Sequence, residues 1–86
     1  MKQDYETRAY IAWNLEDAHE ELTRILDGIS PDKEIDEDEF RVRMAHLYSH
    51  LNTAWNVRNA SASDLDSAGG KQLNSWMRFP EDIEVP

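Results

Sequence analysis

Apolar residues recur with helical spacing over residues 36–59, the longest patterned stretch in the chain. They fall at intervals of four and three, with two aromatic residues beside the row: Phe40, Met44, Leu47, Leu51 and Ala54, flanked by Tyr48 and Trp55. This spacing places the side chains on one face of an α-helix. Because the face is wider than the seam of a simple coiled coil, we expect it to contact more than one neighbouring element.

The residues around Asp36 predict a well-defined helix start. The Asp36 carboxylate can accept a hydrogen bond from a free backbone N–H of the first turn, and Glu39 stands three residues later, as in a capping box. Ile35 and Phe40 have the spacing of a hydrophobic staple. We therefore predict one helix over residues 36–59.

A second amphipathic pattern precedes it, over residues 4–27. Its apolar row is again spaced by four and three: Ile11, Leu15, Ala18, Leu22 and Ile25. Asp4 is a plausible N-cap, Gly28 suits a left-handed C-terminal position, and Pro31 prevents continuation. The short connection that follows is typical of antiparallel neighbours, so the two helices predict an αα-hairpin.

The remainder of the chain changes character. Residues 60–70 are small, polar and end in two glycines, which predicts a flexible linker with at most one helical turn. Residues 71–86 are again rich in apolar side chains, and Leu73, Trp76 and Met77 fit one short helical turn that Pro80 would end. So much apolar surface indicates a tail that packs on the hairpin or on a partner.

The predicted fold is all-α. Residues 1–86 form a single small domain, an antiparallel helical hairpin with an irregular or briefly helical C-terminal tail. Two helices cannot bury faces this wide, so either the tail supplies a third side or two hairpins pair into a four-helix-bundle homodimer. We favour the homodimer, with Tyr48, Leu51 and Trp55 in its interface.

The amino-acid composition limits the kinds of site, partner and cellular location that we expect. The chain has 86 residues, no cysteine and a net charge of −9, so disulfides and cysteine-based zinc sites are excluded. The acidic balance disfavours direct binding of nucleic acid or an anionic membrane. No apolar stretch is long enough to span a membrane, and the N-terminus lacks a signal-peptide core. We expect a cytoplasmic protein.

The sequence contains no complete motif for metal binding or catalysis. His46 and His50 share a helix face, and His19 could add a ligand, but the segment lacks the glutamate of the metalloprotease motif. The acidic run at residues 32–39 fails both registers of a calcium loop and is explained by helix capping. Ser49 beside these histidines lacks the strand–turn–helix context of a nucleophile. We expect no enzyme activity, no cofactor and no structural metal.

The surplus of aromatic side chains favours a protein–protein interaction module, an adaptor or regulator. Antiparallel pairing would bring aromatic residues and the tail to the open end of the hairpin, where we predict partner-binding residues: Tyr10, Trp13, Trp55, Trp76 and Phe79. The alternative for these rings is that they close a small core.

The alternative function is an acidic inhibitor, immunity protein, antitoxin or nucleic-acid mimic that covers a basic site. A helical metal-binding or catalytic protein is a third hypothesis.

Overall fold

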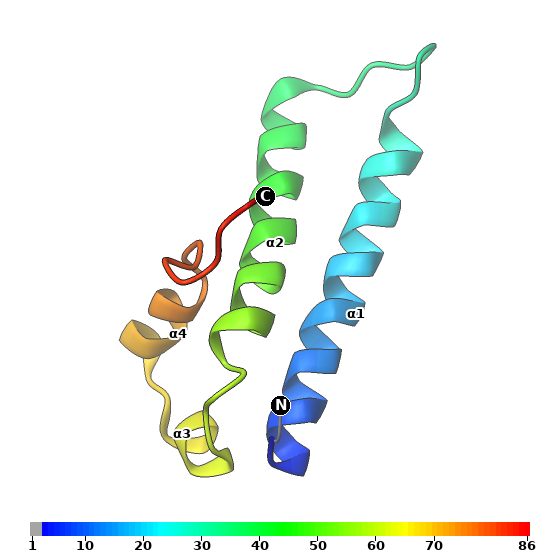
Figure 1. The fold of residues 1–86 in the computed structure, drawn as a ribbon. Helices are drawn as coiled ribbons and strands as arrows, with labels where there is room; N and C mark the ends of the chain where they lie inside the picture. Colours follow the sequence, from blue (N-terminus) through cyan, green and yellow to red (C-terminus); the bar gives the residue numbers. More distant parts are fainter. Residues whose placement is uncertain (1–2) are drawn as a thin grey trace.

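The computed structural model describes residues 3–86, and over this range the chain is all-α (Figure 1). Its four helices are α1 (Tyr5–Gly28), α2 (Glu37–Asn56), α3 (Ala62–Ser67) and α4 (Gly70–Trp76). The two long helices run antiparallel and pack on one another, which confirms the helical hairpin. The short α3 lies at the end of the hairpin where α1 begins, and α4 lies beside α2 (Figure 1).

The seam between α1 and α2 differs from the predicted row of large apolar residues. Five residues of α1 are buried: Thr7, Asn14, Ala18, Glu21 and Ile25. Only Ala18 and Ile25 belong to the predicted row, while Leu15 and Leu22 remain exposed on its flank. Small and hydrogen-bonded side chains thus make the closest helix contact, and the larger residues lie to one side of it.

The polar residues in this seam are paired across the hairpin. The Asn14 side-chain oxygen lies 3.0 Å from Nδ1 of His50, and its amide nitrogen donates to the carbonyl of Tyr10. The buried Glu21 carboxylate lies 3.5 Å from the guanidinium of Arg43. Buried polar groups are tolerated when they are hydrogen-bonded, so these pairs fix the register of the two helices.

The start of α2 confirms the predicted cap. Asp36 is the N-cap, and its carboxylate accepts a hydrogen bond of 3.2 Å from the backbone N–H of Glu39. The Glu39 carboxylate accepts from Arg43 one turn later, at 3.0 and 3.1 Å, instead of completing a capping box. At its other end α2 stops at Asn56, three residues before the predicted end at Asn59.

The left-handed conformation predicted for Gly28 is wrong. No residue of the described range has a positive φ, and α1 continues through Gly28 to an extended Ile29. A Cβ at position 28 would lie 3.3 Å from Cδ1 of Ile35. The glycine therefore serves the close approach of the Ile35 side chain and not a turn.

Asp4 connects the start of α1 to the start of α3. It precedes α1 as its N-cap residue, but its carboxylate accepts from the backbone N–H of Ala62 at 3.1 Å and so caps α3. The hydroxyl of Thr7 donates to the carbonyl of Ala60 at 2.9 Å. These two contacts bring the segment after α2 back onto the first turn of α1.

The apolar core is small for the length of the chain. Its buried members come from both long helices, the α2 exit and α4: Ala18, Ile25, Ala54, Val57 and Trp76. A core of this size leaves much apolar surface outside it. Within the described range, no helix combines the length and the hydropathy that a membrane crossing requires.

Candidate protein-interaction surface

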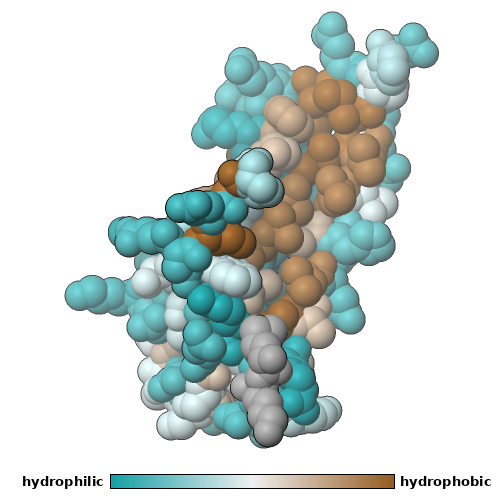
Figure 2. Space-filling model, viewed as in Figure 1, coloured by the Kyte–Doolittle hydropathy of each residue, from teal (hydrophilic) through white to brown (hydrophobic). Residues whose placement is uncertain are grey.

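One side of the hairpin carries most of its large apolar side chains. They come from both long helices, and we call this set the hairpin face: Ile11, Leu15, Leu22, Leu26, Phe40, Met44, Leu47, Tyr48, Leu51 and Trp55. Figure 2 shows apolar residues as a band that follows the hairpin along its length. Leu15, Leu22 and Leu26 expose 42–64% of their surface. Leucines in a closed core are far less accessible, so this surface is open.

The hairpin face is hollowed toward the open end of the hairpin, away from the α1–α2 connection. A cavity of about 230 Å³ lies between α1 and α2, lined by Ile11, Leu15, Leu51, Ala54, Trp55 and Arg58. Its walls are almost entirely apolar. A shallow apolar hollow of this kind is suited to receive a protruding apolar side chain from another protein surface.

The residues predicted for the homodimer interface lie together on this face. Tyr48 and Leu51 are exposed, whereas Trp55 is half-buried. All three also line a second cavity of about 330 Å³ that the C-terminal residues cover in part. They therefore share one surface, and their role in self-association stays a prediction.

Tyr10 and Trp13 lie on a different side of the hairpin from Trp55. Their ring centroids are 6.0 Å apart in a tilted arrangement, and Trp13 is 57% exposed. Both line a cavity of about 360 Å³ that is bordered by His50 on α2 and by Leu73 on α4. The structure thus does not gather Trp13 and Trp55 into one aromatic cluster at the open end.

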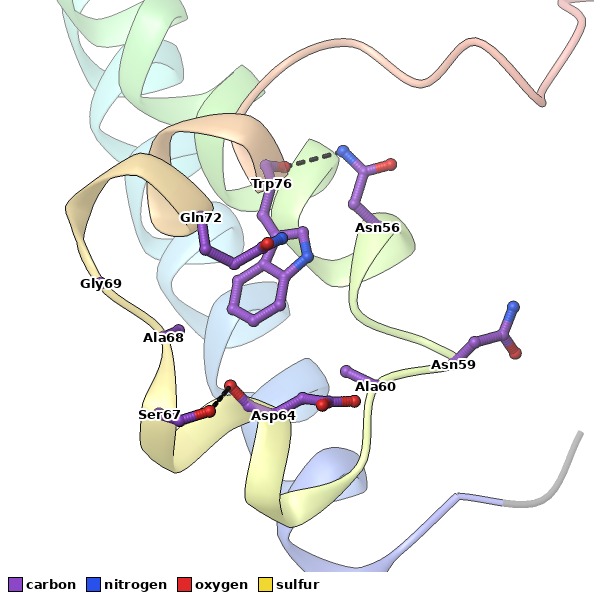
Figure 3. A pocket seen from close by; sticks show the side chains of 9 residues that line it. All are labelled: Asn56, Asn59, Ala60, Asp64, Ser67, Ala68, Gly69, Gln72 and Trp76. Atoms are coloured by element: carbon purple, nitrogen blue, oxygen red, sulfur yellow. Dashed lines mark hydrogen bonds between the residues drawn. The ribbon is translucent and has the colours of Figure 1, made fainter.

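Trp76 is part of the core. Its residue is 9% exposed, and the ring stands beside a hollow of about 370 Å³ between the end of α2 and the α3–α4 segment (Figure 3). The Gln72 side chain lies next to the ring in the same view. This placement favours the core interpretation of Trp76 over a partner contact.

Two asparagines of α2 hold the end of α4. Asn56 donates to the carbonyls of Trp76 and Arg78, both at 2.8 Å, and Figure 3 shows the first of these bonds. Asn52 donates to the carbonyl of Met77 at 2.9 Å. Carbonyls at a helix end lack partners within the helix, so these amides satisfy them. The sequence pattern alone did not predict a role for either asparagine, although their spacing of four places them on one side of α2.

A carboxylate in the tail completes a small polar cluster with α2. The indole N–H of Trp55 donates to one oxygen of Asp82 at 2.9 Å, and the Arg58 guanidinium donates to the other at 2.6 Å. The hydrogen bonds from Trp55 and Arg58 lower the pKa of Asp82 below its ordinary value of 3.8. Phe79 precedes this cluster and is 57% exposed, so its role as a contact residue stays a prediction.

The Ser49 hydroxyl and the His50 ring are hydrogen-bonded to other groups and not to each other. The hydroxyl of Ser49 donates to the carbonyl of His46 at 2.9 Å, whereas His50 is engaged by Asn14. Over residues 3–86, no three side chains of His, Asp or Glu are grouped closely enough to hold a metal ion.

No family model, no curated protein and no solved structure matches this chain.

Proposed function

We propose that this protein is a small interaction module, an adaptor or regulator, that acts by binding through the hairpin face and not by catalysis. The observation that carries the proposal is the exposure of Leu15, Leu22 and Leu26 beside the apolar row of α2. Contiguous apolar patches on the surface of small proteins commonly mark interaction sites. Water in contact with this face is released when a partner covers it, which supplies the driving force.

We propose a second copy of the chain as the principal occupant. Helices of 24 and 20 residues are about 36 and 30 Å long, and two adjacent helices present a surface about 20 Å wide. Covering the shared length would bury roughly 600 Å² per chain, or about 1,200 Å² in total, which reaches the lower limit of standard interfaces. Pairing two such faces about a two-fold axis produces a four-helix bundle.

Charge sets the salt dependence of this association. Each chain carries a net charge of −9, so two copies repel one another electrostatically. Self-association should therefore strengthen as salt screens the repulsion. The alternative function, an acidic inhibitor of a basic partner, requires the opposite dependence, because salt would screen an attraction.

The test introduces one lysine at a time, on α1 within the hairpin face or on α2 outside it. Leu22→Lys places a charge within the hairpin face, whereas Val42→Lys places the same charge beside Glu39 and Arg43, outside this face. Both parent residues are exposed to a similar degree, at 42% and 48%. Because lysine is a good helix former, neither change should disturb the helices, which circular dichroism will verify.

Size-exclusion chromatography with light scattering should find that Leu22→Lys weakens self-association at least about tenfold. Val42→Lys should behave as the wild-type chain does. Equal behaviour of the two variants would refute the hairpin face as the interface.

A further inference from the structure

Residues 79–86, the C-terminal segment, lie along a groove on α2. The groove consists of Tyr48, Leu51, Asn52 and Trp55 of α2 and of Arg58 just after the helix, and we call it the α2 groove. Together with the C-terminal segment, the first four enclose a cavity of about 330 Å³ with almost entirely apolar walls. At one end of the groove stand the two donors that bind the Asp82 carboxylate.

The two donors of the α2 groove also contact each other. The guanidinium carbon of Arg58 lies 3.8 Å from the centre of the Trp55 ring, a cation–π contact. Another nitrogen of the same guanidinium donates to the carbonyl of Trp55 at 3.0 Å. None of these contacts uses the C-terminal segment, so they favour a carboxylate site that keeps its shape when the segment leaves.

The C-terminal segment is held by few contacts. In the described part of the chain, both hydrogen bonds that connect it to α2 end on Asp82. Pro80 is buried, but every other residue of the segment is exposed, up to 82% for Val85. The segment contains no helix. An occupant with one polar anchor and loosely covered apolar residues can leave without unfolding the hairpin.

We propose that the α2 groove is a docking site for an extended acidic segment of a partner protein, and that the C-terminal segment occupies it as a competing internal ligand. The ligand chemistry follows from the present occupant. An aspartate accepts from the Trp55 indole and the Arg58 guanidinium, and apolar residues such as Phe79 and Ile83 on either side cover the groove. Arg–carboxylate contacts of this type give directional recognition.

The C-terminal segment should lower the affinity of a free peptide for the α2 groove by an amount that can be worked out. A tethered ligand acts at an effective concentration of about 1 mM, so it reduces the apparent affinity of any free competitor for the same groove. If the C-terminal segment itself binds with an intrinsic dissociation constant of about 0.1 mM, the reduction is about tenfold. The groove shares Tyr48, Leu51 and Trp55 with the hairpin face, but peptide binding to it does not require self-association.

The probe is a fluorescent peptide with the sequence of residues 79–86, FPEDIEVP, titrated with the full chain and followed by fluorescence anisotropy. It should bind the Asp82→Ala protein about tenfold more tightly than the wild type, because the internal ligand has lost its anchor. Glu81→Ala is the matched control, since it removes a neighbouring carboxylate that does not contact Trp55 or Arg58. This control should bind the peptide as the wild type does.

Specificity is tested with a second peptide in which the aspartate is replaced by alanine. It should bind the Asp82→Ala protein at least about tenfold more weakly than the parent peptide. Equal affinity of the two peptides, or of the parent peptide for wild type and Asp82→Ala, would overturn the proposal. Absence of binding to both Asp82→Ala and the double variant Asp82→Ala/Ile83→Ala would also overturn it.

The titrations are repeated in the Leu22→Lys background. That substitution lies on α1 and is expected to weaken self-association without touching the α2 groove. Peptide binding that persists there supports the docking site whether or not the chain dimerises. Loss of peptide binding together with intact self-association would refute the docking site alone.

Discussion

Replacing the buried Trp76 by alanine should destabilise the protein more than replacing any exposed aromatic residue does. The residue is 9% exposed, and a tryptophan of this kind buries about 150–250 Å² on folding. At about 25 cal/mol per Å², the transfer contribution is roughly 4–6 kcal/mol, and measured losses for emptied aromatic sites are about 3–5 kcal/mol. We expect Trp76→Ala to lower the free energy of unfolding by about 3–5 kcal/mol.

The assay is urea unfolding followed by far-UV circular dichroism, because the helices report on the whole fold independently of the removed ring. Trp13→Ala is the matched control: the same residue type is 57% exposed at that position and should cost less than about 1 kcal/mol. A chain of 86 residues has a total stability of about 4–13 kcal/mol, so the loss at Trp76 is measurable against it. Equal effects of the two substitutions would refute the assignment of Trp76 to the core.

Two further predictions concern the start of α2 and the C-terminal segment. Asp36→Ala should lower the free energy of unfolding by about 0.5–2 kcal/mol in urea titrations, because the Glu39 N–H loses its acceptor, whereas Glu37→Ala should have little effect. The lowered pKa of Asp82 stabilises docking at all pH values above its ordinary 3.8, and this stabilisation is lost as the pH falls through the lower pKa of the docked state. The NMR signal of the Trp55 indole N–H should therefore shift between pH about 5 and about 2, and Asp82→Ala should abolish that shift; an identical shift in the variant would contradict the contact.

The sequence predicted the hairpin well because its signals are local. The Asp36 cap depends on residues 36–39 alone, and the four–three spacing of apolar residues reports helicity without reference to any neighbour. The same spacing could not reveal which side of α1 meets α2. By spacing alone, Leu15 and Leu22 belong to the core and Asn14 and Glu21 to the solvent-facing side. In the structure Asn14 and Glu21 are the buried residues, because His50 and Arg43 on α2 pair with them.

The candidate surface was harder to predict than the fold, because it depends on where the chain returns after α2. The groups that direct this return are separated by more than 20 residues: Asn52 with Met77, Trp55 with Asp82, and Asp4 with Ala62. Their side chains carry no pattern that identifies a distant partner. For this reason the sequence left Trp76 open between a contact residue and a core residue, whereas its burial and the bond from Asn56 to its carbonyl favour the core.

Sedimentation equilibrium of the wild-type chain tests the central proposal most directly. From about 1 to about 100 µM, the mass should rise from 10.0 kDa toward twice that value, and the rise should occur at lower protein concentration as salt increases. Salt dependence of this sign distinguishes apolar self-association from charge-driven binding of an acidic protein to a basic partner. A chain that remains a 10.0 kDa monomer throughout this range at every salt concentration would contradict the homodimer formed through the hairpin face.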